Sequence, residues 1–306
     1  MIVLKKRKLG NSSLWVTELG LGCMSIGTEE KRAREIIETA LDEGINYFDT
    51  ADLYDFGENE KIVGAALKDV REKVIIATKV GNRWNPDKTG WAWDPSKSYI
   101  KEAVKQSLKR LGTDYIDLYQ LHGGTIEDKI DETIEAFDEL KSEGFIRYYG
   151  ISSIRPNVIR EYVKKSHIVS VMMQYSILDR RPEEEALPYL YEHGISVVTR
   201  GPLAKGLLSD KMLEKISPKG YPDYSQEELL KVLPSLKEKL AAQRSFTEIA
   251  LQYNLAHPAV ATVAAGASSP EQVRSNASAV RSQELTEEEV TLIKEISKAG
   301  QFKEHR

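Results

Sequence analysis

Short apolar runs alternate with longer amphipathic stretches along most of this chain. Eight of these runs are rich in Val, Ile, Leu and Tyr, and their apolar character on both faces predicts buried strands. The predicted strands are residues 18–22, 45–49, 74–78, 116–122, 148–152, 169–174, 195–200 and 259–264.

Helical periodicity separates these strands. In residues 127–144, Ile130, Ile134 and Phe137 recur at helical spacing, and Gly144 supplies a C-terminal stop. Similar stretches begin near Lys31, Glu58, Pro95, Pro156, Pro182, Ser245 and Pro270. Eight strands that are each followed by a helix are typical of a parallel (β/α)8 TIM barrel. A doubly wound sheet stays open as an alternative, because periodicity does not reveal whether a sheet closes.

Two further elements are expected outside the repeat. Residues 5–18 alternate around a turn and predict a short N-terminal hairpin. Residues 284–298 predict an extra C-terminal helix, since Thr286 and Glu289 have the spacing of a capping box. No linker or low-complexity segment interrupts the pattern, so we expect residues 1–306 to form one domain.

Composition narrows the function classes. There are 43 Lys and Arg against 47 Asp and Glu, a formal net charge of −4, which argues against a nucleic-acid or anionic-membrane partner. The single cysteine, Cys23, excludes an intrachain disulfide and a cysteine metal site. No apolar run approaches the ~20 residues of a membrane span, and the N-terminal apolar run is too short for a signal peptide. We therefore expect a cytoplasmic protein; the oligomeric state is not determined by these features.

Ionisable side chains stand where three predicted strands end. Asp49, Lys79 and His122 each follow an apolar run, and Tyr54 lies five residues after Asp49. Active sites of parallel barrels are built at the carboxyl ends of the strands. A phenol is a poor acid at neutral pH, but a neighbouring ammonium favours the phenolate. The pattern thus predicts a proton-transfer site: Asp49 holds Lys79, Lys79 assists Tyr54 as the acid, and His122 donates a hydrogen bond to a substrate oxygen.

Each of these residues also has a purely structural interpretation. Asp49 could cap a turn, Tyr54 could be a packing residue and Lys79 could be a surface lysine. Two other enzyme classes could use the same residues. A metal-dependent hydrolase would use Asp49, Asp52 and His122, but only one strand end offers a histidine, so no metal site is predicted. A lyase would form a Schiff base on Lys79.

Six stretches of the chain closely resemble the aldo-keto reductases. They are GLGCMSIG, YFDTADLYDFGENEKIVGAAL, IIATKVG, LGTDYIDLYQLHGG, IRYYGISS and GASSPEQVRSN, and the resemblance covers essentially the whole chain. It implies a barrel that binds NADPH without a Rossmann fold and reduces an aldehyde or ketone, a small-molecule carbonyl substrate. Asp49, Tyr54, Lys79 and His122 match the catalytic tetrad of the family, with Tyr54 protonating the carbonyl oxygen. The alternative is a non-catalytic, NADPH-binding regulatory protein on the same barrel.

The resemblance also implies a cofactor site. The matching residues are Ser152, Ser153 and Gln174 for the nicotinamide carboxamide, Gly201, Pro202, Leu203, Gly206 and Lys211 for the pyrophosphate, and Gly266, Ser268, Gln272 and Asn276 for the adenosine. Two positions depart from the family pattern. Arg200 replaces an aromatic residue that stacks on nicotinamide, and its guanidinium could stack instead. Gln272 replaces a phosphate-binding arginine, so a preference for NADPH over NADH would rest on Lys205, Lys211 or Arg274.

Three tryptophans indicate where substrate specificity would arise. Trp84, Trp91 and Trp93 fall in a Gly-, Asn- and Pro-rich segment with no amphipathic period, which predicts a loop over the barrel mouth. Clustered indoles there would form an apolar wall around the carbonyl group. The alternative is a loop packed by its own tryptophans.

Overall fold

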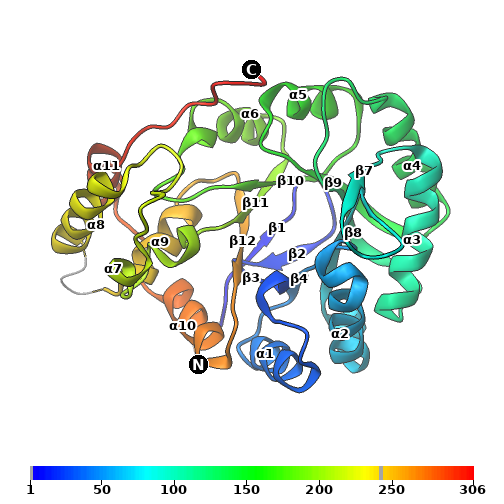
Figure 1. Ribbon diagram of the computed structural model, residues 1–306, viewed down its shortest axis with the longest axis horizontal. Coiled ribbons are helices and arrows are strands. Elements are labelled where there is room, and N and C mark those ends of the chain that lie inside the picture. Colours follow the sequence, from blue (N-terminus) through cyan, green and yellow to red (C-terminus); the bar gives the residue numbers. More distant parts are fainter. Residues whose placement is uncertain (1–2, 241–243) are drawn as a thin grey trace.

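Eight parallel strands close into a barrel with the helices around it (Figure 1). The computed structural model describes residues 3–240 and 244–306. The strands follow each other in the order β10-β11-β12-β3-β4-β5-β8-β9. Their bounds are β3 Leu19–Gly22, β4 Tyr47–Asp49, β5 Ile75–Val80, β8 Ile116–Leu121, β9 Ile146–Ser152, β10 Ser170–Gln174, β11 Ser196–Arg200 and β12 Val260–Gly266. All eight predicted strands are confirmed, and closure excludes the doubly wound sheet.

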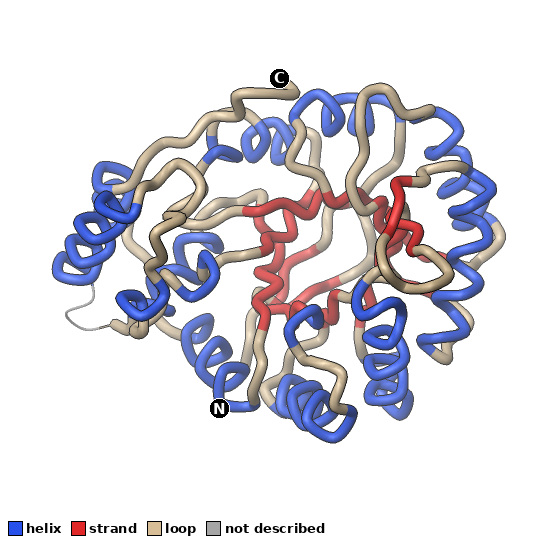
Figure 2. The backbone as a smooth tube through the Cα atoms, viewed as in Figure 1, coloured by secondary structure: helices blue, strands red, loops and turns tan. Residues whose placement is uncertain are grey.

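Helices surround the strands on all sides (Figure 2). They are α1 Glu30–Asp42, α2 Glu58–Leu67, α3 Lys97–Leu111, α4 Ile130–Ser142, α5 Pro156–Lys165, α6 Ala186–Glu192, α7 Met212–Lys215, α8 Gln226–Leu240, α9 Phe246–Leu255, α10 Pro270–Arg281 and α11 Glu287–Ile296. Most begin within a few residues of the predicted start. Near Pro182 a short 3-10 turn, η4 Arg181–Glu183, comes first, and α6 begins only at Ala186. The sequence pattern did not predict α7 and α8, which lie in the long connection after β11.

The N-terminal hairpin covers one end of the barrel. Strands β1 Lys6–Lys8 and β2 Trp15–Thr17 pair in antiparallel fashion, as predicted. Leu9, Leu14 and Val16 of this hairpin pack with the strand residues Tyr47 and Leu118 in one buried cluster. The hairpin thus closes the barrel at the end where the strands begin, which leaves the carboxyl ends of the strands as the accessible mouth. The predicted capping box of α11 is also confirmed, with Thr286 accepting from the backbone of Glu289.

The tryptophan segment differs from the prediction, because it contains a second hairpin rather than a loop without regular structure. Strands β6 Asn82–Trp84 and β7 Trp91–Trp93 pair antiparallel, and Trp84 lies opposite Trp91. Aromatic residues favour strands when they find cross-strand partners. The turn is closed by a backbone bond from the nitrogen of Asn85 to the oxygen of Gly90, 2.8 Å long. These two short strands lie in a Gly-, Asn- and Pro-rich segment, whose composition is typical of a loop.

Three short 3-10 turns complete the mouth: η1 Cys23–Ser25, η2 Tyr54–Gly57 and η5 Ala204–Gly206. Within the described ranges, none of the helices is both long and apolar enough to cross a membrane.

Candidate active site

A buried ion pair joins the ends of two neighbouring barrel strands. Asp49 is the last residue of β4 and Lys79 lies near the end of β5, and their side chains are 5% and 1% exposed. The Nζ of Lys79 donates to Oδ2 of Asp49 at 2.6 Å and to the backbone oxygen of Thr50 at 2.6 Å. Burial by itself lowers the pKa of Lys79, but the charge of Asp49, together with the contacts to Tyr54, raises it by more, so this pKa lies above its ordinary value. The lysine therefore stays an ammonium.

The hydroxyl of Tyr54 meets this ammonium. Tyr54 is the first residue of η2, which follows β4 after a short connection. Its Oη accepts a hydrogen bond from Nζ of Lys79 at 3.3 Å. The same nitrogen lies 4.9 Å from the centre of the Tyr54 ring. Because the oxygen acts as acceptor in this contact, its own hydrogen stays free for a third group.

His122 faces the same phenol from the end of β8, the strand on the other side of β5 from β4. It follows β8 directly, and its ring stands edge-on to the ring of Tyr54, with centroids 6.0 Å apart. Burial first, and then the charges of Lys79 and Arg200, lower the pKa of His122 to about 3. The imidazole is therefore neutral near pH 7. Its Nδ1 is buried and has no hydrogen-bond partner in the described part of the chain.

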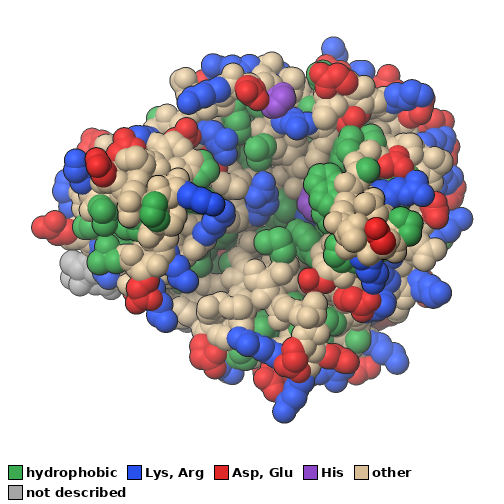
Figure 3. Space-filling view, in the orientation of Figure 1, with side chains coloured by type: hydrophobic (Ala, Val, Ile, Leu, Met, Phe, Trp, Pro, Cys, Tyr) green, Lys and Arg blue, Asp and Glu red, His purple; other side chains and the backbone are tan. Residues whose placement is uncertain are grey.

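The structure thus brings together all four residues that the sequence singled out. An ammonium behind a phenol stabilises the phenolate that forms when the phenol gives up its proton. A neutral imidazole beside it is suited to a hydrogen bond with an oxygen atom. Figure 3 shows the face of the molecule with the barrel at its centre, and this centre is hollowed between basic and hydrophobic side chains.

The residues expected to hold the nicotinamide lie at the ends of three adjacent strands. Ser152 ends β9 and pairs with Met172 of β10, two residues before Gln174. Gln174 ends β10 and pairs with Arg200 at the end of β11. Nη1 of Arg200 donates to Oε1 of Gln174 at 3.1 Å, and the arginine side chain is exposed. Ser152 and Ser153 are 9% and 5% exposed. These donors line one side of the mouth.

The predicted pyrophosphate segment follows β11. Gly201 has φ +66°, and in η5 Ala204 and Lys205 also have positive φ of 46° and 59°. Such left-handed conformations are costly for non-glycine residues and are held only when the surrounding structure imposes them. The segment is therefore a bent loop beside the mouth. Its remaining predicted members are Pro202, Leu203, Gly206 and Lys211.

The predicted adenosine residues gather at the N-terminus of α10. Oε1 of Gln272 accepts from the backbone nitrogen and the hydroxyl of Ser268, at 2.8 and 3.2 Å. Gly266 ends β12, and Asn276 is 5% exposed within α10. Arg274 makes one long contact with Glu271, at 3.9 Å.

Several polar residues of the mouth were missed by the sequence interpretation. Nε2 of Gln120 donates to Oδ1 of Asp49 at 3.3 Å. Asp179 and Tyr221, which were also missed, accept from Nε2 of the predicted residue Gln174 at 2.8 and 3.2 Å. Arg32 of α1 donates from Nη2 to the backbone oxygen of Ser268 at 2.8 Å. Of these missed residues, only Gln120 could have been found from the sequence, because it lies near the end of a predicted strand.

The three tryptophans have different surroundings. Trp93 lies against Gly81 and Gly123, where an added Cβ would be 2.6 and 3.2 Å from its ring, and its Nε1 donates to Asp128 at 3.0 Å. Gly123 follows His122, so Trp93 lies beside the predicted site. Trp91 is 55% exposed. Trp84 packs on Phe56 and Gly57 of the η2 turn and on Arg110 of α3.

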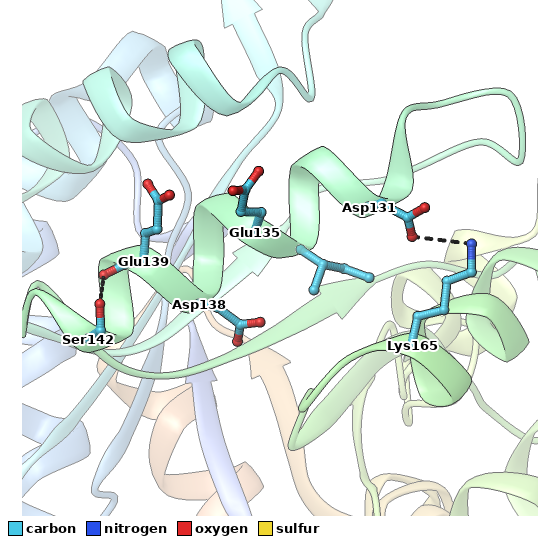
Figure 4. Close-up of a pocket in the computed structure, with 7 residues that line it drawn as sticks. Asp131, Glu135, Asp138, Glu139, Ser142 and Lys165 are labelled. Carbon is cyan, nitrogen blue, oxygen red and sulfur yellow. Dashed lines mark hydrogen bonds and ion pairs between the residues drawn. The ribbon is translucent and has the colours of Figure 1, made fainter.

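Two hollows lie away from the mouth. One, of about 550 Å³, runs along the outer side of α4, and Figure 4 shows Asp131, Glu135, Asp138 and Glu139 along it, with Lys165 paired to Asp131. The other, of about 950 Å³, lies between the N-terminal residues Val3 to Arg7 and the helices α9 to α11. Neither is lined by a predicted site residue. Across the described residues, no group of three His, Cys, Asp or Glu side chains is placed to hold a metal ion.

Three kinds of comparison with known proteins agree with one another. Residues 18–298 match the Aldo/keto reductase family. The chain is 61% identical to the uncharacterized oxidoreductase YqkF of Bacillus subtilis, over 99% of this chain and 100% of that protein, and 34% identical to the NADH-specific methylglyoxal reductase of Escherichia coli, over 97% and 99%. The holo structure of the aldo-keto reductase AKR11C1 from Bacillus halodurans superposes with a TM-score of 0.94 at 62% identity, covering 99% of both chains.

Proposed function

The chain belongs to the Aldo/keto reductase family and is an oxidoreductase, and we propose that it uses NADPH to reduce an aldehyde or ketone to an alcohol, with Tyr54 as the general acid. One observation carries this proposal. A single ammonium, Nζ of Lys79, contacts both the carboxylate of Asp49 at 2.6 Å and the hydroxyl of Tyr54 at 3.3 Å. This is the arrangement that a proton donor to a developing alkoxide requires.

Each residue of the tetrad has one task in this proposal. The substrate carbonyl oxygen lies between the hydroxyl of Tyr54 and the imidazole of His122, and accepts a hydrogen bond from each. The bound nucleotide supplies a hydride to the carbonyl carbon. As negative charge grows on the oxygen, Tyr54 gives it a proton, and Lys79 stabilises the phenolate that is left. Asp49 keeps the ammonium in place and balances its charge.

The residues at the mouth fit a nicotinamide nucleotide. Hydroxyl and amide groups of Ser152 and Gln174 stand at adjacent strand ends, where a carboxamide could bond to them. The guanidinium of Arg200 is exposed, and its planar group can stack on a nicotinamide ring. The N-terminus of the twelve-residue helix α10 and the nearby cations favour phosphate groups. We assign these residues to cofactor binding and Trp93 to the substrate pocket.

The test is nucleotide oxidation with a panel of aldehydes and ketones, followed by absorbance, for the wild type and Tyr54→Phe. The phenylalanine keeps the ring and removes only the acid, so we expect kcat to fall by at least about 10²-fold while the dissociation constant for NADPH stays the same. Equal turnover by the two proteins would exclude Tyr54 as the acid. A protein that binds NADPH but turns over no carbonyl would favour the non-catalytic regulator.

A parallel titration with NADPH and NADH addresses the choice of cofactor. The E. coli relative is named as NADH-specific, so the comparison must include both nucleotides. We expect tighter binding of NADPH, because the cations near the predicted adenosine site can pair with a 2′-phosphate. Tighter binding of NADH would contradict this part of the proposal.

A further inference from the structure

The turn that carries Tyr54 has an unusual backbone. Asp55 and Phe56 have φ of 48° and 52°, and Gly57 has φ of 85°, so three consecutive residues after Tyr54 are left-handed. Each non-glycine residue in this conformation costs about 1–2 kcal/mol. A phenylalanine has no polar side chain to offset this cost locally. The turn must therefore be held by contacts from outside it.

Two side chains supply these contacts. The ring of Phe56 stands edge-on to the indole of Trp84, with centroids 6.3 Å apart. A Cβ added at Gly57 would lie 2.7 Å from Cδ of Arg110 and 3.0 Å from Cη2 of Trp84, so both side chains press on the glycine backbone. The guanidinium of Arg110 lies 5.1 Å from the centre of the Trp84 ring. Trp84 and Arg110 thus form one stacked pair against the turn.

The stacked pair is anchored to the strand that carries Lys79. Nε of Arg110 donates to Oε2 of Glu60 at 2.6 Å, and the carboxylate of Glu60 is fully buried. The other oxygen of Glu60 accepts from the hydroxyl of Thr78 at 2.6 Å. Thr78 immediately precedes Lys79 in β5. A continuous set of contacts therefore runs from the neighbour of Lys79, through α2 and α3, to the turn that begins with Tyr54.

We infer that Trp84 and Arg110 are positioning residues, which hold the turn after Tyr54 in its left-handed form and so fix the Tyr54 hydroxyl against Nζ of Lys79. The kinetic part of this inference rests on the proposed function. Trp84 then acts on the acid through Phe56 and Gly57, and takes no part in a substrate wall. Since a displacement of about 1 Å can cost about 10²-fold in rate, a loosened turn should slow the reaction strongly.

The kinetic test compares Trp84→Ala and Trp84→Phe with the wild type. We expect Trp84→Ala to lower kcat about 30-fold while KM for the nucleotide stays within about twofold. Trp84→Phe keeps an aromatic ring against Phe56 and should restore kcat to within about threefold of the wild type. The matched control is Trp15→Ala, because Trp15 is 55% exposed on β2 at the other end of the barrel. An unchanged kcat in Trp84→Ala, or an equal loss in Trp15→Ala, would overturn the inference.

A second measurement does not depend on turnover. Amide hydrogen exchange reports local opening of the backbone. In Trp84→Ala we expect the amides of residues 55–58 to exchange at least about tenfold faster, with β5 and β8 unchanged and Trp15→Ala like the wild type. If exchange in the turn stays the same, the positioning role is wrong whether or not the protein reduces carbonyls. If exchange rises but the wild type reduces no carbonyl, the proposed function fails and the role of Trp84 in holding the turn remains supported.

Discussion

Lys79 and Asp49 form an ion pair of 2.6 Å from which water is almost wholly excluded, with side chains 1% and 5% exposed. Removing either charge would leave the other buried without a partner, so each residue is needed for the other to stay charged in the folded protein. The same pair therefore contributes to the stability of the fold and holds the ammonium that contacts Tyr54.

The first prediction concerns this dependence. Asp49→Asn leaves the ammonium of Lys79 buried with a neutral neighbour, so we expect the free energy of unfolding to fall by about 3 kcal/mol. The double variant Asp49→Asn with Lys79→Met removes both charges and should regain at least half of that loss without regaining activity. Urea denaturation measures both effects. Glu132→Gln is the control. It breaks an ion pair on the surface, in which Glu132 is 51% and Lys129 79% exposed, and should leave stability nearly unchanged. A double variant less stable than Asp49→Asn would contradict the prediction.

His122 predicts a specific dependence of stability on pH. Its pKa is lowered to about 3, mainly by burial, whereas in the unfolded chain a histidine titrates near 6.5. Between these values the unfolded state binds a proton that the folded state does not, so this residue makes the protein less stable as the pH falls through 6.5. Between pH 7 and pH 5 the wild type should lose about 2 kcal/mol more than His122→Gln. Urea denaturation at the two pH values gives the difference, and equal losses would show that His122 is not held neutral.

The position of Arg32 predicts that removing its side chain weakens the binding of NADPH but not of NADH. Its guanidinium bonds to the backbone oxygen of Ser268 at 2.8 Å and so lies beside the predicted adenosine site. A charge-assisted bond to a 2′-phosphate would contribute about 1.5 kcal/mol. We expect Arg32→Ala to weaken NADPH binding about tenfold and to leave NADH binding unchanged, measured by fluorescence titration. Arg34→Ala, on the same helix and also exposed, is the matched control. A loss of affinity for both nucleotides alike would assign Arg32 a structural role.

The packing around Gly64 predicts that alanine at this position destabilises the protein, although alanine is the better helix former. It lies inside α2, and a Cβ at this position would be 2.2 Å from the backbone oxygen of Leu111 at the end of α3. Alanine normally stabilises a helix by about 1 kcal/mol relative to glycine. Here the close approach of two backbones should reverse the sign, and we expect Gly64→Ala to cost about 2 kcal/mol. Ala65→Gly, at the exposed next position, should cost about 1 kcal/mol from propensity alone. A Gly64→Ala protein as stable as the wild type in urea would show that α2 can move away from α3.

The sequence predicted the parts of this protein that depend on local patterns. Each barrel strand is an apolar run, and Asp49, Lys79 and His122 were found because each follows such a run. Tyr54 was found from its distance to Asp49 along the chain. The β6–β7 hairpin was not predicted, because its short strands lie in a Gly-, Asn- and Pro-rich segment whose composition is typical of a loop.

The amino-acid sequence by itself determined the eight strands, most of the helices around them, the three ionisable side chains at strand ends and Tyr54 close behind one of them, because these follow from periodicity and from neighbours in the chain. Only the tertiary structure decided that the sheet closes, that Arg32 reaches Ser268 and that Trp84 packs on Phe56. These contacts join residues distant in sequence or on separate elements. They are set by how whole helices and strands pack, which no local pattern records.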